Sequence, residues 1–328
     1  AASIYGIYSA TMSDATVQKV ERDIEPKLAA HRDRITQNAK LFARIAKVYE
    51  ARDKSGLNDE QRRLVWLTYT NFVRSGAQLD AAAKKKLADI NQQLAGLYTR
   101  FNQNLLADEG ERYTLLEAEA DLAGLPESVR AGAAAGAEGR GFKGKWLIAN
   151  TRSSVEPFLT YSTRRDLREK IWRTFVDRGD NGDAHDNNAI IAEILQLRSR
   201  RAKLLGFPTH AHWRLQDSMA RTPERATELM EAVWKPAVAR VHEEVADMQA
   251  IADKEGAGIR IEPWDYRHYA EKVRVAKYAL DNNELKPYLQ LEKLREGMFY
   301  VAGELFGLRF EALPPGTVPV YHPDVRVW

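Results

Sequence analysis

Apolar residues recur at steps of three and four along most of this chain, which is the spacing of one face of an α-helix. The cleanest example follows Asp80, a residue type that often caps the N-terminus of a helix. The apolar positions in this stretch are Leu87, Ile90, Leu94, Leu97, Phe101 and Leu105. Because a half-buried strand would need apolar residues at every second position, the pattern predicts a mainly α-helical fold.

Capping residues indicate where several helices begin and end. Asn58 and Gln61 have the spacing of a capping box, in which each side chain accepts from the other residue's backbone amide. Gly76, Gly206 and Gly307 are expected to end helices because glycine adopts a positive φ at low cost. The predicted helices cover residues 13–52 with Pro26 as a candidate break, 58–75, 80–105, 162–177, 187–205, 222–251, 266–280 and 288–306.

Short β-prone runs interrupt the helical pattern at two places. The first region combines the runs at 113–116, 145–148 and 155–161 with a loop at 131–141. A single strand is predicted at 259–261, and two or three strands are predicted at 308–310, 318–321 and 325–328. We therefore expect an antiparallel helical array over 1–110, a small β-containing insert over 111–161 and a further helical part over 162–328 with small β elements around 308–328.

The composition excludes several chemistries and partners. The chain has no cysteine, which excludes disulfides, thiolate zinc sites, iron–sulfur clusters and thiol nucleophiles. Lysine and arginine number 49 against 46 acidic residues, and a net charge of +3 is too small to indicate nucleic-acid or membrane binding. No apolar run approaches the roughly 20 residues of a membrane span. The compartment, cytoplasmic or periplasmic, stays undecided.

Histidines and carboxylates are the remaining candidates for a metal site. The histidines are His31, His185, His210, His212, His242, His268 and His322. His242-Glu243 begins like the zinc-protease motif His-Glu-x-x-His, but Ala246 occupies the position of the second histidine. His210 and His212 would point apart on the helix that Thr209 is expected to cap. The residues themselves therefore predict no catalytic group and no metal ligand.

Other stretches with polar or small residues are also explained by structural roles. The acidic stretch 177–186 has glycines at calcium-ligand positions, so we expect a solvated loop that caps the next helix. The glycines at 132–141 lack the spacing of a phosphate-binding loop, and no Gly-x-Ser-x-Gly nucleophile motif is present. The basic runs 84–86 and 198–201 have no interleaved aromatic residues, which is typical of solvated helix faces.

Five separated segments carry a family resemblance over essentially the whole chain. They are KLFARI at 40–45, LLGFPT at 204–209 with MARTP at 219–223, PWDY at 263–266 with YAEK at 269–272, GMF at 297–299 with LFG at 305–307, and PVYHPDVRVW at 319–328. In this order they resemble the zinc oligopeptidases that include thimet oligopeptidase, oligopeptidase A and bacterial peptidyl-dipeptidase (dipeptidyl carboxypeptidase). The resemblance is closest to the peptidyl-dipeptidase branch.

The resemblance implies the helical lobe of a two-lobed neurolysin- or thimet-oligopeptidase-like fold, whose long cleft admits short unstructured peptides. In that family, the His-Glu-x-x-His helix, the further zinc-binding glutamate and the substrate-binding His and Tyr residues all lie downstream of the segment ending at Trp328. The resemblance therefore implies the N-terminal and middle part of a zinc peptidyl-dipeptidase, with residues 162–328 as a cleft wall. Zinc is expected in the intact enzyme and none on this chain, and the substrate-binding residues stay unknown.

Three functional alternatives remain open at this point. The chain alone is an inactive part of an enzyme that releases C-terminal dipeptides from short peptides, or it associates with a separate C-terminal catalytic segment to form an active particle. Alternatively, it is a self-contained helical peptide-binding or interaction module without catalysis. The first alternative also predicts that the strands near the C-terminus begin a small sheet, completed by residues beyond Trp328.

Overall fold

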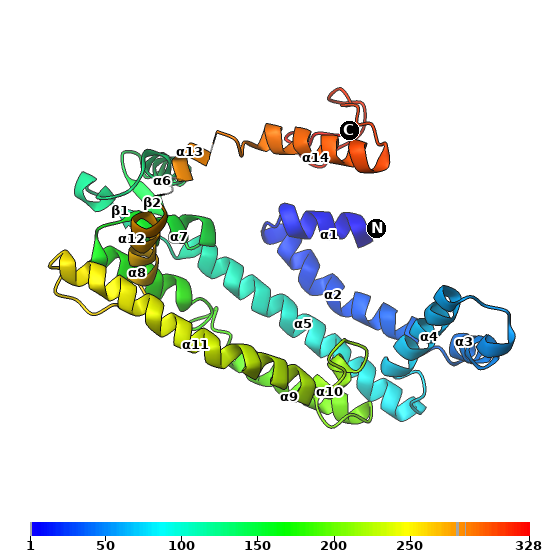
Figure 1. The fold of residues 1–328 in the computed structure, drawn as a ribbon. Coiled ribbons are helices and arrows are strands. Elements are labelled where there is room, and N and C mark those ends of the chain that lie inside the picture. The colour runs from blue at the N-terminus through cyan, green and yellow to red at the C-terminus, as the bar shows by residue number, and fades with distance from the viewer. Residues whose placement is uncertain (1, 280–281, 286) are drawn as a thin grey trace.

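A computed structural model describes residues 2–279, 282–285 and 287–328 and shows a mainly helical fold, as predicted (Figure 1). The helices are α1 Ala2–Thr11, α2 Ala15–Thr36, α3 Ala39–Ala51, α4 Asp59–Arg74, α5 Ala81–Glu111, α6 Glu127–Glu138, α7 Arg152–Tyr161, α8 Arg165–Val176, α9 Asn188–Leu204, α10 His210–Leu215, α11 Pro223–Lys254, α12 Tyr266–Tyr278, α13 Asn282–Leu285 and α14 Leu291–Phe306. Two 3-10 helices, η1 Arg52–Lys54 and η2 Glu119–Leu122, and two strands, β1 Thr114–Leu116 and β2 Trp146–Ile148, complete the elements. None of the described helices is both long and apolar enough to cross a membrane.

The long helix α5 is the centre of the N-terminal half. The helix α2 runs along it in the opposite direction, and α9 packs on it through apolar side chains (Figure 1). The buried members of this α5–α9 core are Leu94, Leu97, Ile190, Ile194 and Leu197. The predicted caps are confirmed, because Asp80 accepts from the Ala83 amide and Asn58 and Gln61 form a capping box.

The predicted break at Pro26 is wrong, because α2 continues through this residue. A proline inside a helix removes one amide donor and leaves the carbonyl four residues earlier without its helical partner. That residue here is Arg22, which is exposed, so water can bond its carbonyl. The helix ends instead at Thr36, with Gln37 as its C-cap, and Asn38 caps α3 by accepting from the Leu41 amide at 3.0 Å.

The predicted insert contains one small antiparallel sheet, in which Thr114 pairs with Ile148 and Leu116 with Trp146. The predicted strand at 155–161 is wrong, because these residues lie in α7. Its buried side chains Val155, Phe158 and Leu159 have helical spacing and join the core around the sheet. The predicted loop at 131–141 is also wrong. Most of it is α6, whose buried alanines let the helix pack closely on β2.

The predicted strand at 259–261 does not form, because a side chain takes the role of a strand partner. Gln249 of α11 donates to the Ile259 carbonyl at 2.8 Å and accepts from the Ile261 amide at 3.0 Å. Ile259 and Ile261 pack beside Met248 and Tyr269 in an irregular segment. The following helix α12 ends at Tyr278, and the predicted end at Leu280 lies outside the described residues.

The predicted strands within 308–328 are also wrong, since this segment is irregular throughout. The amide of Leu313 donates to the Val327 carbonyl at 2.9 Å, but no ladder follows from this bond. Pro314, Pro315 and Pro323 cannot donate to a neighbouring strand. The segment folds back on α14 instead, where the ring centroids of Phe299 and Phe310 are 4.2 Å apart.

A buried ion pair network joins α8 to the residues before α12. Asp265, which is 0% exposed, accepts from Arg168 at 2.8 Å and from Arg165 at 2.8 Å. Its Oδ2 also accepts from the Glu262 amide. Because the carboxylate has several charged or backbone donors, its burial is compensated. The network fixes the start of α12 within the core.

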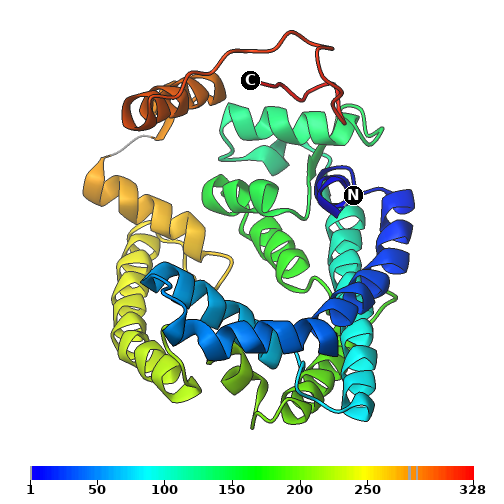
Figure 2. The ribbon, with the colours of Figure 1, turned by 90° about the vertical axis from the view of Figure 1, so that its right-hand side faces the viewer.

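Two helices expose apolar faces that have the spacing of buried faces. On α14, every residue of the stripe is more than half exposed: Leu291, Leu294, Met298, Val301 and Leu305. On α11, Met230 and Val233 are exposed, whereas Met248 further along is buried. Figure 2 shows α14 at one end of the molecule, beside the C-terminal segment and apart from the long helices. These faces have the composition of interfaces.

Candidate functional site

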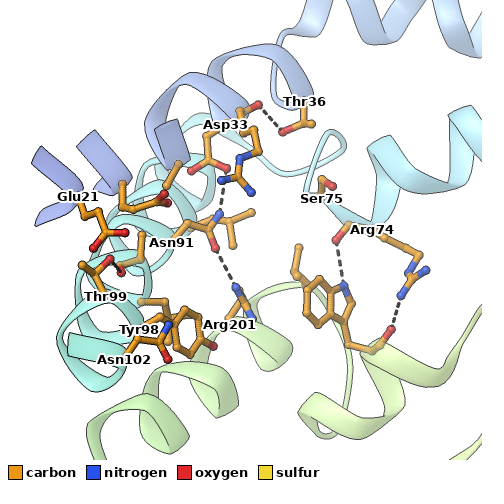
Figure 3. Close-up of a pocket in the computed structure, with 18 of the residues that line it drawn as sticks. Glu21, Asp33, Thr36, Arg74, Ser75, Asn91, Tyr98, Thr99, Asn102 and Arg201 are labelled. Carbon is orange, nitrogen blue, oxygen red and sulfur yellow. Dashed lines mark hydrogen bonds between the residues drawn. The ribbon is translucent and has the colours of Figure 1, made fainter. Parts of the chain in front are cut away.

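A cavity of about 580 Å³ lies between α1, α2, the end of α4, α5, α9 and α10 (Figure 3). Its volume is in the range of small-molecule sites. The residues that line it are Tyr5, Ser9, Glu21, Glu25, Ala29, Arg32, Asp33, Thr36, Arg74, Ser75, Leu87, Asn91, Leu94, Ala95, Tyr98, Thr99, Asn102, Arg201, Leu205 and Trp213. Many of these are charged or carry hydrogen-bonding groups, so the cavity is suited to a polar ligand.

One hydrogen-bonded chain crosses this cavity from α2 through α5 to α9. The Asn91 amide donates to Asp33 Oδ1 at 2.9 Å, and Arg201 Nη1 donates to Asn91 Oδ1 at 3.2 Å. Figure 3 shows Asn91 between the two charged residues. Asp33 is 8% exposed, and burial raises the pKa of its carboxyl, while the Asn91 bond and Arg32 and Arg201 oppose this rise. A neutral amide therefore separates the carboxylate from the guanidinium.

The α2 side of the cavity, which we call the acidic wall, consists of Glu21, Glu25 and Asp33. Glu21 accepts from the Gln103 side chain at 3.0 Å, and Glu25 accepts from the Tyr5 hydroxyl at 2.9 Å. Burial and the Glu25 carboxylate raise the pKa of Tyr5. Within the described ranges, none of the three carboxylates has a cationic side chain within ion-pair distance. Their hydrogen-bond donors are thus neutral groups, although the charge of Arg32, which also lines the cavity, favours the ionised form of Asp33.

The opposite side, the basic wall, consists of Arg74, Arg201 and the indole of Trp213. Arg74 pairs with Asp217 and donates to the Trp213 carbonyl at 2.7 Å, and the Trp213 indole donates to the Arg74 carbonyl at 3.0 Å. Arg201 lies over the Trp213 ring, 4.7 Å from its centroid. Burial, with Arg198 and Arg214 nearby, lowers the pKa of Arg201. Since Arg74 is paired with Asp217, the unpaired positive charge of this wall is that of Arg201.

The basic wall also influences a neighbouring histidine. Burial, together with the charges of Arg201, Arg198 and Arg214, lowers the pKa of His210 to about 4. The His210 ring stands 5.5 Å from that of Trp213, and its buried Nδ1 has no hydrogen-bond partner. His210 is thus neutral at physiological pH and adds no charge to this side of the cavity.

The histidines of the sequence do not come together. His31 and His242 are exposed, whereas His185, His212 and His322 lie singly beside Glu111, Glu224 and Asp324. His268 is buried, with Nδ1 3.1 Å from the Thr160 carbonyl. In the part of the chain that the structure describes, no three His, Cys, Asp or Glu side chains form a group that could hold a metal. These residues do not fit a zinc ion.

Sequence reasoning missed the cavity residues altogether. Arg201 belongs to the basic run 198–201, which was predicted to be a solvated face, yet burial lowers its pKa and its Nε is buried. Asp33 and Asn91 have no distinctive sequence context. The only signal was helical phase, since a charged residue on the inward face of a helix must find partners inside the fold.

The acidic stretch 177–186 does form a capping loop, as Asp186 accepts from the Gly182 and Asn188 amides.

Comparison with known proteins supports the family resemblance. Over 327 residues, or 99% of this chain, it is 38% identical to dipeptidyl carboxypeptidase of Escherichia coli K12 and covers 48% of that protein. The values are the same for dipeptidyl carboxypeptidase of Salmonella typhimurium LT2. Identity to oligopeptidase A of E. coli K12 is 30% over 305 residues, which covers 92% of this chain and 44% of that protein. The chain spans about half the length of these curated relatives.

A match to the family as a whole extends over the second half of the chain. Residues 158–328 match peptidase family M3, and this region includes four of the five segments on which the resemblance rests. M3 peptidases are zinc metallopeptidases. Since the match covers just over half of the residues and agrees with the relatives above, the chain belongs to peptidase family M3.

Proposed function

We propose that this chain forms a wall of the peptide channel of a zinc-dependent peptidyl-dipeptidase, which releases dipeptides from the C-terminal ends of short peptides. The observation that carries the proposal is the identity of 38% over 99% of the chain to proteins named dipeptidyl carboxypeptidase. Identity to the oligopeptidase A branch is lower, at 30% for the E. coli protein. The peptidyl-dipeptidase branch is therefore the better supported of the two.

In this proposal, the zinc ion and the catalytic groups come from a part of the enzyme outside these 328 residues. Two observations support it: the chain covers 48% of the length of its E. coli relative, and its described residues do not fit a metal site. We accordingly assign no step of peptide hydrolysis to a residue of this chain. Its role is to bind and confine peptide, and the chain alone is inactive.

The apolar faces of α14 and α11 agree with this arrangement. A row of five apolar side chains on α14, each more than half exposed, has the size and spacing of a helix-packing surface. Burial of such a row is favourable at about 25 cal/mol per Å² of apolar surface. We propose that the remaining part of the enzyme covers these faces.

A chimera tests the proposal directly. This chain would replace the matching half of E. coli dipeptidyl carboxypeptidase, and the product would be assayed with N-blocked tetrapeptides that have either a free or an amidated C-terminus. We expect release of dipeptides from the free form only, and loss of this activity with a zinc chelator. A chimera that binds one zinc per chain yet releases no dipeptide would contradict the proposal. Chelator-sensitive hydrolysis by the 328-residue chain alone would contradict its inactivity.

The charged cavity favours a second candidate function, a helical peptide-binding module that needs no catalytic partner. Both walls carry groups suited to a peptide's termini. In that case the chain binds a fluorescently labelled peptide without hydrolysis, and the zinc-loaded chimera is inactive. Activity of the chimera with a free C-terminus would decide in favour of the peptidase.

A further inference from the structure

We propose that the cavity between α2, α5 and α9 binds a free dipeptide as a zwitterion, with its carboxylate at Arg201 and its ammonium group at the acidic wall. The proposal stands on the charges of this cavity and does not depend on whether the chain takes part in peptide hydrolysis. It concerns a site in the helical part of the molecule, built entirely from residues of this chain.

Arg201 is a cation without a charged partner among the described residues. Its guanidinium is mostly buried, and its Nε atom is buried without a hydrogen-bond partner. Nη1 donates to Asn91, the Tyr98 side chain is a second polar neighbour, and among the described residues no carboxylate lies within ion-pair distance of Arg201. Burial of a charge is costly unless the charge is paired. A ligand carboxylate would supply the missing partner, and arginine binds carboxylates well because its planar donors match the two oxygens.

Asp33, on the opposite wall, has one carboxylate oxygen without a partner. This side chain is more than nine-tenths buried, and its Oδ2 atom has no hydrogen-bond partner. Glu21 and Glu25 line the same cavity and are bonded only to the neutral groups of Gln103 and Tyr5. An ammonium group placed in the cavity would neutralise part of this negative charge.

The two walls carry opposite charges that do not pair directly with each other. Charges of opposite sign line one cavity, but Asn91 stands between Asp33 and Arg201 and prevents a direct ion pair (Figure 3). If the only role of Asp33 and Arg201 were to stabilise the fold, a direct ion pair between them would compensate the burial of both charges. Their separation instead suits a ligand that carries a positive and a negative end. A free dipeptide has this chemistry, and a cavity of about 580 Å³ is large enough for a small ligand.

Blocked ligands test the proposal on the unaltered 328-residue chain. Isothermal titration calorimetry would compare Ala-Ala with N-acetyl-Ala-Ala, which lacks the ammonium group, and with Ala-Ala amide, which lacks the carboxylate. We expect Ala-Ala to bind and each blocked form to bind about tenfold more weakly, since each loses a charge-assisted contact. Equal affinity for all three ligands, or no binding of Ala-Ala, would overturn the proposal.

Variants then place the binding in this cavity. Arg201→Gln and Asp33→Asn are each expected to weaken Ala-Ala binding about tenfold. Arg200→Gln is the matched control, because Arg200 is the exposed neighbour on the same helix and does not line the cavity. Arg201→Lys keeps the charge and should retain part of the affinity. Circular dichroism would establish that each variant is folded, and an Ala-Ala affinity unchanged in folded Arg201→Gln would refute the assignment.

Discussion

At the scale of single residues, burial of His268 has a clear consequence for proton binding. The side chain is 7% exposed, and burial, together with the positive charges of Arg168 and Lys272, lowers its pKa to about 4. In an unfolded chain the pKa of histidine is about 6.5. Between these two values the unfolded state binds a proton that the folded state does not bind. The folded state is therefore favoured above pH 6.5 and loses this advantage as the pH falls towards 4.

We therefore predict that the free energy of unfolding decreases as the pH falls from about 6.5 to 4, by up to about 1.4 kcal/mol per pH unit from His268 alone. His268→Gln removes this titrating group from both states and should reduce the slope, while His210, whose pKa is also lowered to about 4, keeps part of the dependence. His242→Gln, at an exposed position on α11, is the control and should keep the slope of the unaltered chain. Urea unfolding at several pH values measures the free energy of unfolding as a function of pH. Identical slopes of this free energy against pH for both variants would contradict the prediction.

What the sequence can predict at this scale depends on how local a contact is. The capping box of Asn58 and Gln61 joins residues three positions apart, so its spacing alone was sufficient. The contacts of Asp33 with Asn91 and of Asn91 with Arg201 join residues 58 and 110 positions apart. Only the packing of α2, α5 and α9 brings them together. No sequence pattern around these residues could therefore predict the cavity.

At the scale of helices and strands, the three- and four-residue spacing of apolar side chains predicted most helices correctly. The β-propensity of short runs, in contrast, predicted several strands that do not form. The strands β1 and β2 were predicted and form, because they pair with each other and cover a core. The run at 155–161 has similar composition, but its buried residues follow helical spacing in α7. Gln249 satisfies the backbone at 259–261, which removes the need for a strand partner. Tertiary contacts thus decided between helix, strand and irregular structure.

The α5–α9 contact provides a prediction about stability. Leu197 on α9 is 4% exposed within this core, whereas Leu195 on the same helix is 58% exposed. Leu197→Ala should lower the free energy of unfolding by about 2–5 kcal/mol, because it leaves a cavity between two long helices. Leu195→Ala should change it by about 0.5 kcal/mol or less. Thermal and urea unfolding would measure both, and a similar loss for the two variants would show that α9 does not pack on α5 in this way.

At the scale of the whole molecule, the exposed face of α14 should make the chain associate. We predict that it binds a hydrophobic dye and that its apparent mass in light-scattering chromatography increases with concentration. Replacing Met298 and Leu305 together by glutamate should lower both effects. Leu64→Glu, at an exposed leucine of α4 outside this face, should leave them unchanged. A compact monomer that is stable to dilution and binds no dye would contradict the prediction.

The small size of the sheet determines what form such association can take. Its two strands have three residues each and pair with one another, and the described part of 308–328 forms no strand. Fibrils grow when unpaired strand edges recruit further strands, and this molecule offers only very short edges in its described parts. Its assemblies should therefore form by side-to-side packing of helices. Such assemblies keep their circular dichroism spectrum, do not seed the conversion of fresh protein and dissolve when the solution is diluted.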